Sequence, residues 1–260
     1  MASIHKISVL EWDSNFFGQK MGKIGFDPTD EANCFSETAW RQTIETARKQ
    51  QFQFLFCEFD AAQKRLAHIL CNIGGSLGDV LLTLECDLRE VEPRQLPVSR
   101  VAPATPDDLP GIIEIARDSF EQSRFFHDPR FDRIKVSQIY PQWVRDSFEK
   151  TENFFIIKEQ FAVRAFISVA VDRAASVLTI RLLAVDHAMQ GKGMGQELID
   201  WVIGYAGNEQ IRRIEVGTQV GNYPAIRLYE KNRFRMAGAK YRFHIWLDHA
   251  EQARKGHIIP

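Results

Sequence analysis

Three glycines stand close together after an apolar run and before a pattern of helical spacing. They belong to the stretch Gln190-Gly191-Lys192-Gly193-Met194-Gly195. Glycine adopts positive φ at little cost and allows the backbone to approach a ligand closely. The first N–H groups of a helix have no partner inside it, and the positive end of the helix dipole attracts anions. These residues therefore predict a backbone site that binds a diphosphate.

The spacing excludes two common phosphate-binding loops. A P-loop requires Gly-Lys-Ser/Thr, but Lys192 is followed by Gly193. The dinucleotide-binding fingerprint requires a third glycine where this chain has Gln196. What remains is a Gln-x-x-Gly-x-Gly spacing made by Gln190, Gly193 and Gly195. A glycine-rich turn that binds no ligand is the alternative interpretation of the same residues.

The composition predicts a globular protein with no bulk electrostatic attraction for a partner. The chain has 260 residues, 45% of them hydrophobic, which suits one large or two small domains with a substantial core. Its 33 basic and 34 acidic residues give a net charge of −1, so we expect neither nucleic acid nor membrane as a partner. The first residues contain no long apolar core, and no apolar run reaches about 18 residues, so we expect a cytoplasmic protein.

The four cysteines, Cys34, Cys57, Cys71 and Cys86, are widely spaced. No Cys-x-x-Cys pair or Cys/His cluster occurs, so the spacing favours neither a metal site nor a disulfide framework. We expect reduced thiols in the core and no bound metal.

Residues 1–92 are expected to form a small α/β domain. Strands are expected at Ile4–Trp12, Met21–Phe26, Phe52–Phe59 and Val80–Leu88, and helices at Ser36–Gln50 and Ala61–Ile73. Gly74 and Gly75 are typical of a helix end. The stretch Ser14–Gly18 is expected to be a turn that presents two phenylalanines.

Residues 93–100 contain Pro93 and Pro97, fit neither periodicity and predict a linker. A second domain follows at residues 101–250, with a tail at 251–260. Its first half is expected to contain a strand from Val101, a helix from Pro106, a helix near 134–148, and strands at 154–157, 161–171 and 177–185. Its second half is expected to contain a helix after the glycine-rich stretch, a strand at 211–218, a helix at 223–231, and a strand or strand pair at 234–247. The order is therefore β-α-α-β-β-β-α-β-α-β.

The glycine-rich stretch and this element order together resemble the GNAT superfamily of N-acetyltransferases. The resemblance implies an α/β (α+β) GNAT fold, with a central mixed, mostly antiparallel sheet flanked by helices and preceded here by the smaller domain. It implies acyl-coenzyme A as co-substrate, and a strand pair, 177–185 and 211–218, that splays to admit the pantetheine arm. The implied coenzyme-binding residues are Leu183, Ala184, Val185, Gln190, Gly191, Lys192, Gly193, Met194, Gly195, Asn222 and Ala225.

Further blocks resemble the bacterial dTDP-sugar N-acyltransferases of the dTDP-fucosamine acetyltransferase type. They are Leu10, Trp12, Asn15, Phe16, Phe17 and Gly18; Phe120, Gln122, Ser123, Arg124 and Phe125; Tyr140, Gln142 and Trp143; and Thr218, Gln219, Gly221, Asn222, Ala225 and Tyr229. The resemblance implies a dTDP-linked amino sugar as acceptor and a role in surface polysaccharide synthesis. The implied substrate-binding residues are Asn15, Phe16, Phe17, Ser123, Arg124, Phe125 and Phe126, with Arg124 as the partner of the diphosphate.

The resemblance places the general acid at Tyr229. A phenol with a pKa of about 10 can protonate a thiolate with a pKa of about 8.5. The general base stays open between His127, whose ordinary pKa suits the task, Glu85, and a chain of water molecules. Similar enzymes have an acidic residue slightly upstream of Glu85, where this chain has Thr83.

Two other functions stay open. One is an acetyltransferase for a peptide or a small polyamine, which would need an acidic groove, whereas Arg124, Arg130 and Arg133 make the expected acceptor loop basic. The other is a non-catalytic module that senses coenzyme A. The sequence leaves the choice between monomer and homodimer open.

Overall fold

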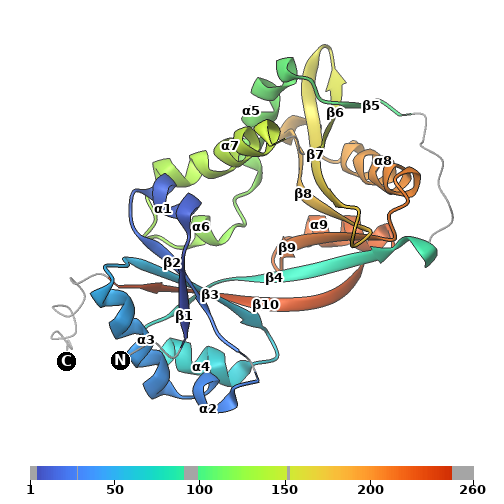
Figure 1. Ribbon diagram of the computed structural model, residues 1–260. Helices are drawn as coiled ribbons and strands as arrows, with labels where there is room; N and C mark the ends of the chain where they lie inside the picture. The colour runs from blue at the N-terminus through green and yellow to red at the C-terminus, as the bar shows by residue number, and fades with distance from the viewer. Residues whose placement is uncertain (1–4, 28, 91–98, 151–152, 248–260) are drawn as a thin grey trace, which may run out of the picture. The chain divides into compact units, whose positions relative to one another are not determined.

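The structure of the chain is a computed structural model that describes residues 5–27, 29–90, 99–150 and 153–247 (Figure 1). The contacts divide the chain into two compact units. Unit one comprises Met1–Val80 and Lys240–Pro260, and unit two comprises Leu81–Ala239. The expected division was residues 1–92 and 101–250, whereas the contacts place residues 81–90 in unit two and residues 240–247 in unit one. Residues 93–98 of the expected linker, and the expected tail, lie outside the described residues.

Unit one contains the strands β1 (Lys6–Val9), β2 (Met21–Gly25) and β3 (Phe54–Asp60), together with the end of β10 (Arg235–Trp246). Their order is β1-β2-β3-β10, with β2 and β3 parallel and the other neighbours antiparallel. The helices are α1 (Glu11–Phe17), α2 (Glu31–Cys34), α3 (Glu37–Lys49) and α4 (Lys64–Asn72). Side chains of α3 and α4, such as Trp40 and Leu66, pack against β3 in one apolar core.

The expected strand Ile4–Trp12 is wrong after Val9. The strand ends there, and Glu11–Phe17 forms the helix α1, so the expected aromatic turn is helical. Gly18 ends this helix in the left-handed conformation, with φ of 68°, and its N–H donates to the carbonyl of Ser14. The acidic residues Glu11 and Asp13 in the first turn favour the positive helix end.

Unit two contains β5 (Val101–Pro103), β6 (Asn153–Glu159), β7 (Ala162–Asp172), β8 (Val177–Val185) and β9 (Arg213–Gln219), and most of β4 (Ser76–Asp87). Their order is β4-β9-β8-β7-β6-β5, and only β8 and β9 are parallel in this part of the described sheet. The helices are α5 (Leu109–Ser119), α6 (Arg124–His127), α7 (Arg133–Glu149), α8 (Met194–Asn208) and α9 (Tyr223–Lys231).

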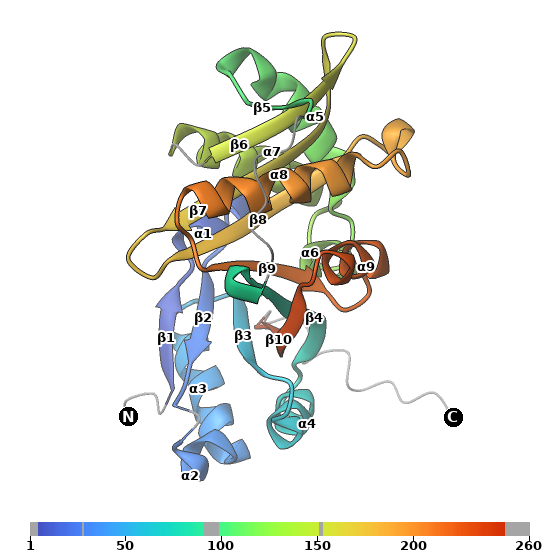
Figure 2. The same ribbon diagram turned by 90° about the vertical axis from the view of Figure 1, so that its right-hand side faces the viewer.

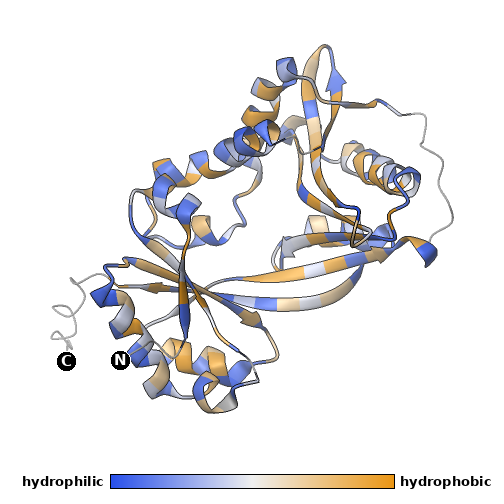
Figure 3. Ribbon diagram, viewed as in Figure 1, coloured by the Kyte–Doolittle hydropathy of each residue, from blue (hydrophilic) through white to orange (hydrophobic). Residues whose placement is uncertain are grey.

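The helices of unit two cover both faces of its sheet. Figure 2 shows α8 on one face of β7 and β8 and α5 on the other, with α7 beside α5. Leu198, Val202 and Ala206 of α8 are fully buried against the strands. Long hydrophobic stretches lie on the strands, whereas the helices alternate between hydrophobic and hydrophilic turns (Figure 3). The mixed, mostly antiparallel sheet flanked by helices confirms the expected fold class.

The element order expected after residue 100 is confirmed except for one additional short helix, α6, between the two expected helices, and the expected strand or strand pair at the end is the single strand β10. Cys34, Cys57 and Cys86 are buried as expected, whereas Cys71 is exposed. Burial raises the pKa of the Cys57 thiol well above its ordinary value. No helix in the described part of the chain has the length and apolar character needed to cross a lipid bilayer.

Candidate active site

The parallel strands β8 and β9 are paired only at their beginnings. Residues Val177–Ile180 pair with Arg213–Val216, but β8 continues to Val185 and β9 continues to Gln219. Over that second half β9 stays bonded to β4 on its other side. In the described chain, the backbone groups of residues 182–185 that point toward β9 therefore have no strand partner there. Such a gap can receive an extended ligand as an added strand.

A β-bulge lies where the two strands part. Ile180 and Leu182 pair with the adjacent residues Val169 and Ser168 of β7, so Arg181 has no partner on that strand. A bulge bends its strand and increases the local twist. The bulge thus accompanies the separation of β8 from β9.

The glycine-rich stretch forms an open turn of unpaired N–H groups ahead of α8. Gly191 and Gly193 have φ of 77° and 83°, and a Cβ at either position would meet no atom within 4 Å. In the described part of the chain, no backbone N–H from Gly191 to Gln196 donates a hydrogen bond. The turn therefore presents consecutive donors at the positive end of a helix of 15 residues. We call residues 190–196 the cradle.

The link between β8 and the cradle is fixed by a carboxylate. Asp186 accepts a hydrogen bond from the N–H of Ala188 at 2.9 Å and one from Arg164 at 2.7 Å. The Ala188 N–H, and next the Arg164 guanidinium, hold the pKa of Asp186 below its ordinary value. The side chain of Gln190 turns back toward the carbonyl of Val185, with an Nε2–O distance of 3.4 Å.

The cradle end of α8 lies close to α9. A Cβ on Gly195 would lie 3.3 Å from Cδ2 of Leu228 on α9, so glycine allows the two helices to approach. Asn222 precedes α9, and its Oδ1 accepts from the N–H of Ala225 at 3.4 Å. Asn222 is therefore the N-cap of α9.

Tyr229 is buried beneath the cradle helix. Its side chain belongs to the same apolar core as Leu198 and Val202 of α8, and its ring centroid lies 5.3 Å from that of Phe234. Only 4% of the residue is exposed, and burial raises the pKa of its phenol well above the ordinary value. No described residue forms a hydrogen bond with the Tyr229 hydroxyl. Burial therefore disfavours the charged phenolate form of Tyr229.

The resemblance to the GNAT superfamily implied a splayed parallel strand pair that leads into a cradle of this kind. Residues 109–234 match the model of the acetyltransferase (GNAT) family. The chain carries a GNAT acetyltransferase domain. The expected resemblance to that superfamily is thus confirmed over the part of the chain that holds the gap, the cradle and Tyr229.

Curated relatives of this chain include proteins of two bacteria. Spore coat polysaccharide biosynthesis protein SpsD of Bacillus subtilis is 31% identical over 151 residues, which are 58% of this chain and 52% of that protein. The dTDP-fucosamine acetyltransferase of Escherichia coli O6:H1 is 28% identical over 161 residues, which are 59% of this chain and 66% of that protein. The chain thus spans about half to two thirds of the length of these relatives.

Solved structures share the fold. A functionally unknown conserved protein of Staphylococcus epidermidis has a TM-score of 0.67 at 14% identity, covering 94% of this chain and 91% of that one. A GCN5-related N-acetyltransferase of Sphaerobacter thermophilus has a TM-score of 0.66 at 12% identity, covering 94% of this chain and 77% of that one. At such identities the likeness concerns the fold alone.

In the GNAT domain, the residues expected at the acceptor form the short helix α6. The guanidinium carbon of Arg124 lies 4.0 Å from the ring centroid of Phe125. Phe125 is 1% exposed and packs edge-on against Phe131 and Trp143, so its ring packs mainly inside the protein and supports Arg124. A contact of Phe125 with the substrate stays a prediction. Ser123 is 4% exposed, and within the described chain its Oγ has no hydrogen-bond partner.

The two side chains expected as bases have different surroundings. His127 is exposed at the end of α6. Glu85 of β4 lies opposite Glu215 of β9, and its Oε2 is 3.9 Å from Nε of Arg213. Glu215 in turn pairs with Thr179 of β8, and only the pair of Ile180 and Val216 follows before the two strands part. Glu85 therefore lies at the closed part of the strand pair.

The remaining expected contacts, Asn15, Phe16 and Phe17, belong to α1 of unit one. Phe16 is half-buried and stacks on Trp12 with centroids 4.9 Å apart, and Asn15 is exposed. Phe17 is 7% exposed and serves mainly as a core residue.

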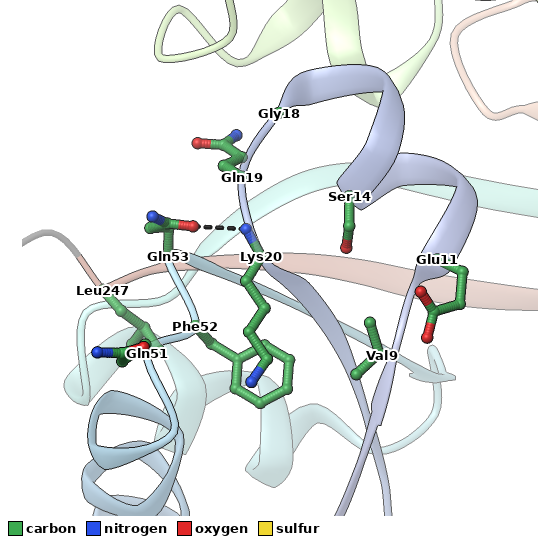
Figure 4. Close-up of a pocket in the computed structure, with 10 residues that line it drawn as sticks. All are labelled: Val9, Glu11, Ser14, Gly18, Gln19, Lys20, Gln51, Phe52, Gln53 and Leu247. Carbon is green, nitrogen blue, oxygen red and sulfur yellow. Dashed lines mark hydrogen bonds between the residues drawn. The ribbon is translucent and has the colours of Figure 1, made fainter.

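Unit one also has a hollow of about 750 Å³ that none of these three residues lines. Figure 4 shows Lys20 and Phe52 inside it, with the Lys20 ammonium 4.5 Å from the centre of the ring. The backbone N–H of Lys20 donates to Oε1 of Gln53. The amide side chains in this hollow carry no sequence signal that would have predicted it. No group of His, Cys, Asp or Glu suited to a metal ion occurs in the described residues of either unit.

Proposed function

We propose that this protein is a coenzyme A-dependent N-acyltransferase acting on a dTDP-linked 3-amino- or 4-amino-dideoxyhexose. The acyl group is acetyl or a short chain such as 3-hydroxybutyryl. The observation that carries the proposal is that β8 leads directly from its unpaired edge, at residues 182–185, into the cradle. An acyl carrier with a pantetheine arm and a diphosphate fits these two features in that order.

In this proposal the backbone of the GNAT domain holds the carrier. Backbone donors from Gly191 to Gly195 bind its diphosphate, and the N–H near Leu183 faces the thioester oxygen, where negative charge develops during attack. Ala184, Val185, Met194, Asn222 and Ala225 border the arm and the diphosphate, and the ammonium of Lys192 adds attraction. Because backbone groups do most of this binding, it tolerates changes of side chain.

The chemistry requires two proton transfers. The neutral acceptor amine attacks the thioester carbon, which forms the C–N bond, and its nitrogen then loses a proton to a base. The tetrahedral intermediate collapses, the C–S bond breaks, and Tyr229 protonates the departing thiolate. His127 and Glu85 are the side chains proposed as the base. The buried phenol keeps its proton at neutral pH because burial disfavours the phenolate.

The activities of two relatives and the basic residues near α6 support this acceptor class. One relative is a dTDP-fucosamine acetyltransferase and another a spore coat polysaccharide biosynthesis protein. We propose that Arg124 contacts the diphosphate of the acceptor and that Ser123 and Phe126 contact its sugar or base. The product would enter a surface polysaccharide, and the reaction would take place in the cytoplasm, where acyl-coenzyme A is made.

The test is release of free thiol from acyl-coenzyme A. Acetyl- and 3-hydroxybutyryl-coenzyme A are incubated with the protein and a panel of dTDP-3-amino and dTDP-4-amino sugars, with a thiol reagent as reporter. A rate that depends on one of these sugars supports the proposal, and no thiol release with any of them rejects it. Release with peptides or polyamines alone identifies the other acetyltransferase function. Binding of coenzyme A without any turnover identifies a sensing module.

A further inference from the structure

The second half of β8 begins with an arginine that the bulge singles out. Arg181 is the extra residue between Ile180 and Leu182, and it is exposed. Ile180 is also the last residue of β8 that pairs with β9. Bulges occur often beside active sites, where they redirect a side chain. This one places a cation at the point where the two strands part.

Arg181 lines a hollow of about 850 Å³ in unit two. The charged residues of its lining are Asp172, Arg173, Arg181, Arg213 and Glu215. Two of the arginines are neutralised, because Arg173 lies 2.5 Å from a carboxylate oxygen of Glu209 and Arg213 lies 2.8 Å from one of Glu215.

Arg181 has no such neighbour. Asp172 lies at the hairpin end of the hollow, opposite Val177, and its carboxylate accepts the N–H of Ala175 at 2.9 Å. Within the described part of the chain, no carboxylate pairs with Arg181. The hollow therefore offers one guanidinium with free donors, which is suited to bidentate binding of a phosphate.

We infer that Arg181 binds the phosphate nearest the sugar in a nucleoside diphosphate-linked acceptor. The inference rests on the proposed function. The carrier's phosphates are assigned to the cradle, beyond the far end of β8, so a second anion at the bulge belongs to the other substrate. Arg181 precedes Leu183 by two residues, ~6–7 Å along a strand, which is comparable to the span of a hexose ring. An amine on that ring can then face the thioester while the sugar phosphate faces Arg181.

The test uses the full chain and measures binding of dTDP, pyrophosphate and coenzyme A by calorimetry. The variants are Arg181→Gln, Arg181→Lys and the control Arg212→Gln, which removes an exposed arginine outside the hollow. We expect Arg181→Gln to weaken dTDP binding about tenfold or more and Arg181→Lys to weaken it less. The affinity for coenzyme A should be the same in the Arg181 variants as in the unchanged protein. The Arg212→Gln control should bind both dTDP and coenzyme A as the unchanged protein does. In thiol-release assays, the KM for the sugar nucleotide should rise while that for acyl-coenzyme A stays constant.

Three results overturn the inference: no binding of dTDP by the unchanged protein, equal dTDP binding by Arg181→Gln, or a loss of coenzyme A binding in that variant instead. The last result assigns Arg181 to the carrier's phosphates. Dependence of dTDP binding on Arg181 without thiol release from any amino sugar rejects the proposed function and keeps the inference. If the sugars support thiol release and Arg181→Gln leaves that release unaffected, the proposed function stands and the inference is rejected.

Discussion

The side-chain amides of Gln196 and Asn232 exchange two hydrogen bonds, from Gln196 Nε2 to Asn232 Oδ1 at 2.7 Å and from Asn232 Nδ2 to Gln196 Oε1 at 3.0 Å. Gln196 lies in the first turn of α8 and Asn232 directly after α9. Asn232 is 2% exposed and also donates to the carbonyl of Leu228. The pair thus ties the cradle helix to the helix that carries Tyr229.

Replacing Asn232 by leucine should therefore loosen the site as well as the fold. Asn232→Leu leaves the Gln196 amide and the Leu228 carbonyl without these partners, and we expect the free energy of unfolding to fall by about 1–3 kcal/mol. Denaturant unfolding measures this change. Asn208→Leu at the exposed end of α8 is the control, with an expected effect within about 0.5 kcal/mol. Equal stability of the two variants would contradict a structural role for the amide pair.

Tyr229→Phe should separate chemistry from binding. The variant keeps the buried ring but removes the proton donor, so we expect kcat to fall by roughly 10²- to 10⁴-fold. Affinity for coenzyme A, measured by calorimetry, should not change. Tyr205→Phe on α8 is the control, because Tyr205 is also partly buried and its pKa is raised by burial, but no part in the reaction is proposed for it. Full turnover by Tyr229→Phe would show that another group protonates the thiolate.

Gly193 and Gly207 provide a matched pair for testing the cradle. A Cβ at either position meets no atom within 4 Å, but Gly193 has φ of 83° and Gly207 lies in α8. Gly193→Ala should cost about 1–2 kcal/mol of backbone strain and raise the KM for acyl-coenzyme A, because the turn of donors shifts. Gly207→Ala should gain up to about 1 kcal/mol of helix propensity and leave that KM unchanged. If the KM of both variants equals that of the unchanged protein, the cradle does not bind the carrier.

The proposed bases can be distinguished by the pH dependence of turnover. Glu85 lies near Arg213 at the closed part of the strands, whereas His127 is exposed on α6, so we expect His127 to accept the proton. His127→Gln should lower kcat/KM for the amine by about 10²-fold and alter its acidic limb, and Glu85→Gln should change neither. The opposite pattern assigns the base to Glu85. Unchanged profiles in both variants indicate a water chain.

Acid should weaken the link between β8 and the cradle. The pKa of Asp186 is lowered in the folded protein, so its carboxylate stabilises the fold above its ordinary pKa of about 4, and this contribution is lost as the pH falls. Asp186→Asn should thus reduce stability at pH 7 by about 1 kcal/mol. Below about pH 4, the difference in stability between the variant and the unchanged protein should become smaller. Thermal unfolding of both proteins across that pH range measures this difference. A constant difference at all pH values would show that the charge of Asp186 contributes nothing.

The sequence by itself determined the features that depend on neighbouring residues. The helix at 223–231 was predicted with its observed bounds, because Asn222 supplies a local N-cap and the apolar spacing is short-range. The open turn at Gly191 and Gly193 was likewise predicted, since positive φ is a property of the residue itself. Short apolar runs separated by turns predicted the meander of β6, β7 and β8.

Only the tertiary structure decided which side chains of these elements reach a site. The parting of β8 from β9 and the bulge at Arg181 depend on hydrogen bonds between strands that are separated in sequence, and no local pattern encodes that register. The burial of Phe125 depends on Phe131 and Trp143, which approach it through folding of α7. The surroundings of Glu85 also depend on long-range pairing. Nothing near Glu85 in the sequence indicates a neighbour, and Glu215 and Arg213 come close to it only because β4 pairs with β9. Local preferences fix the elements, whereas long-range pairing fixes what those elements bring together.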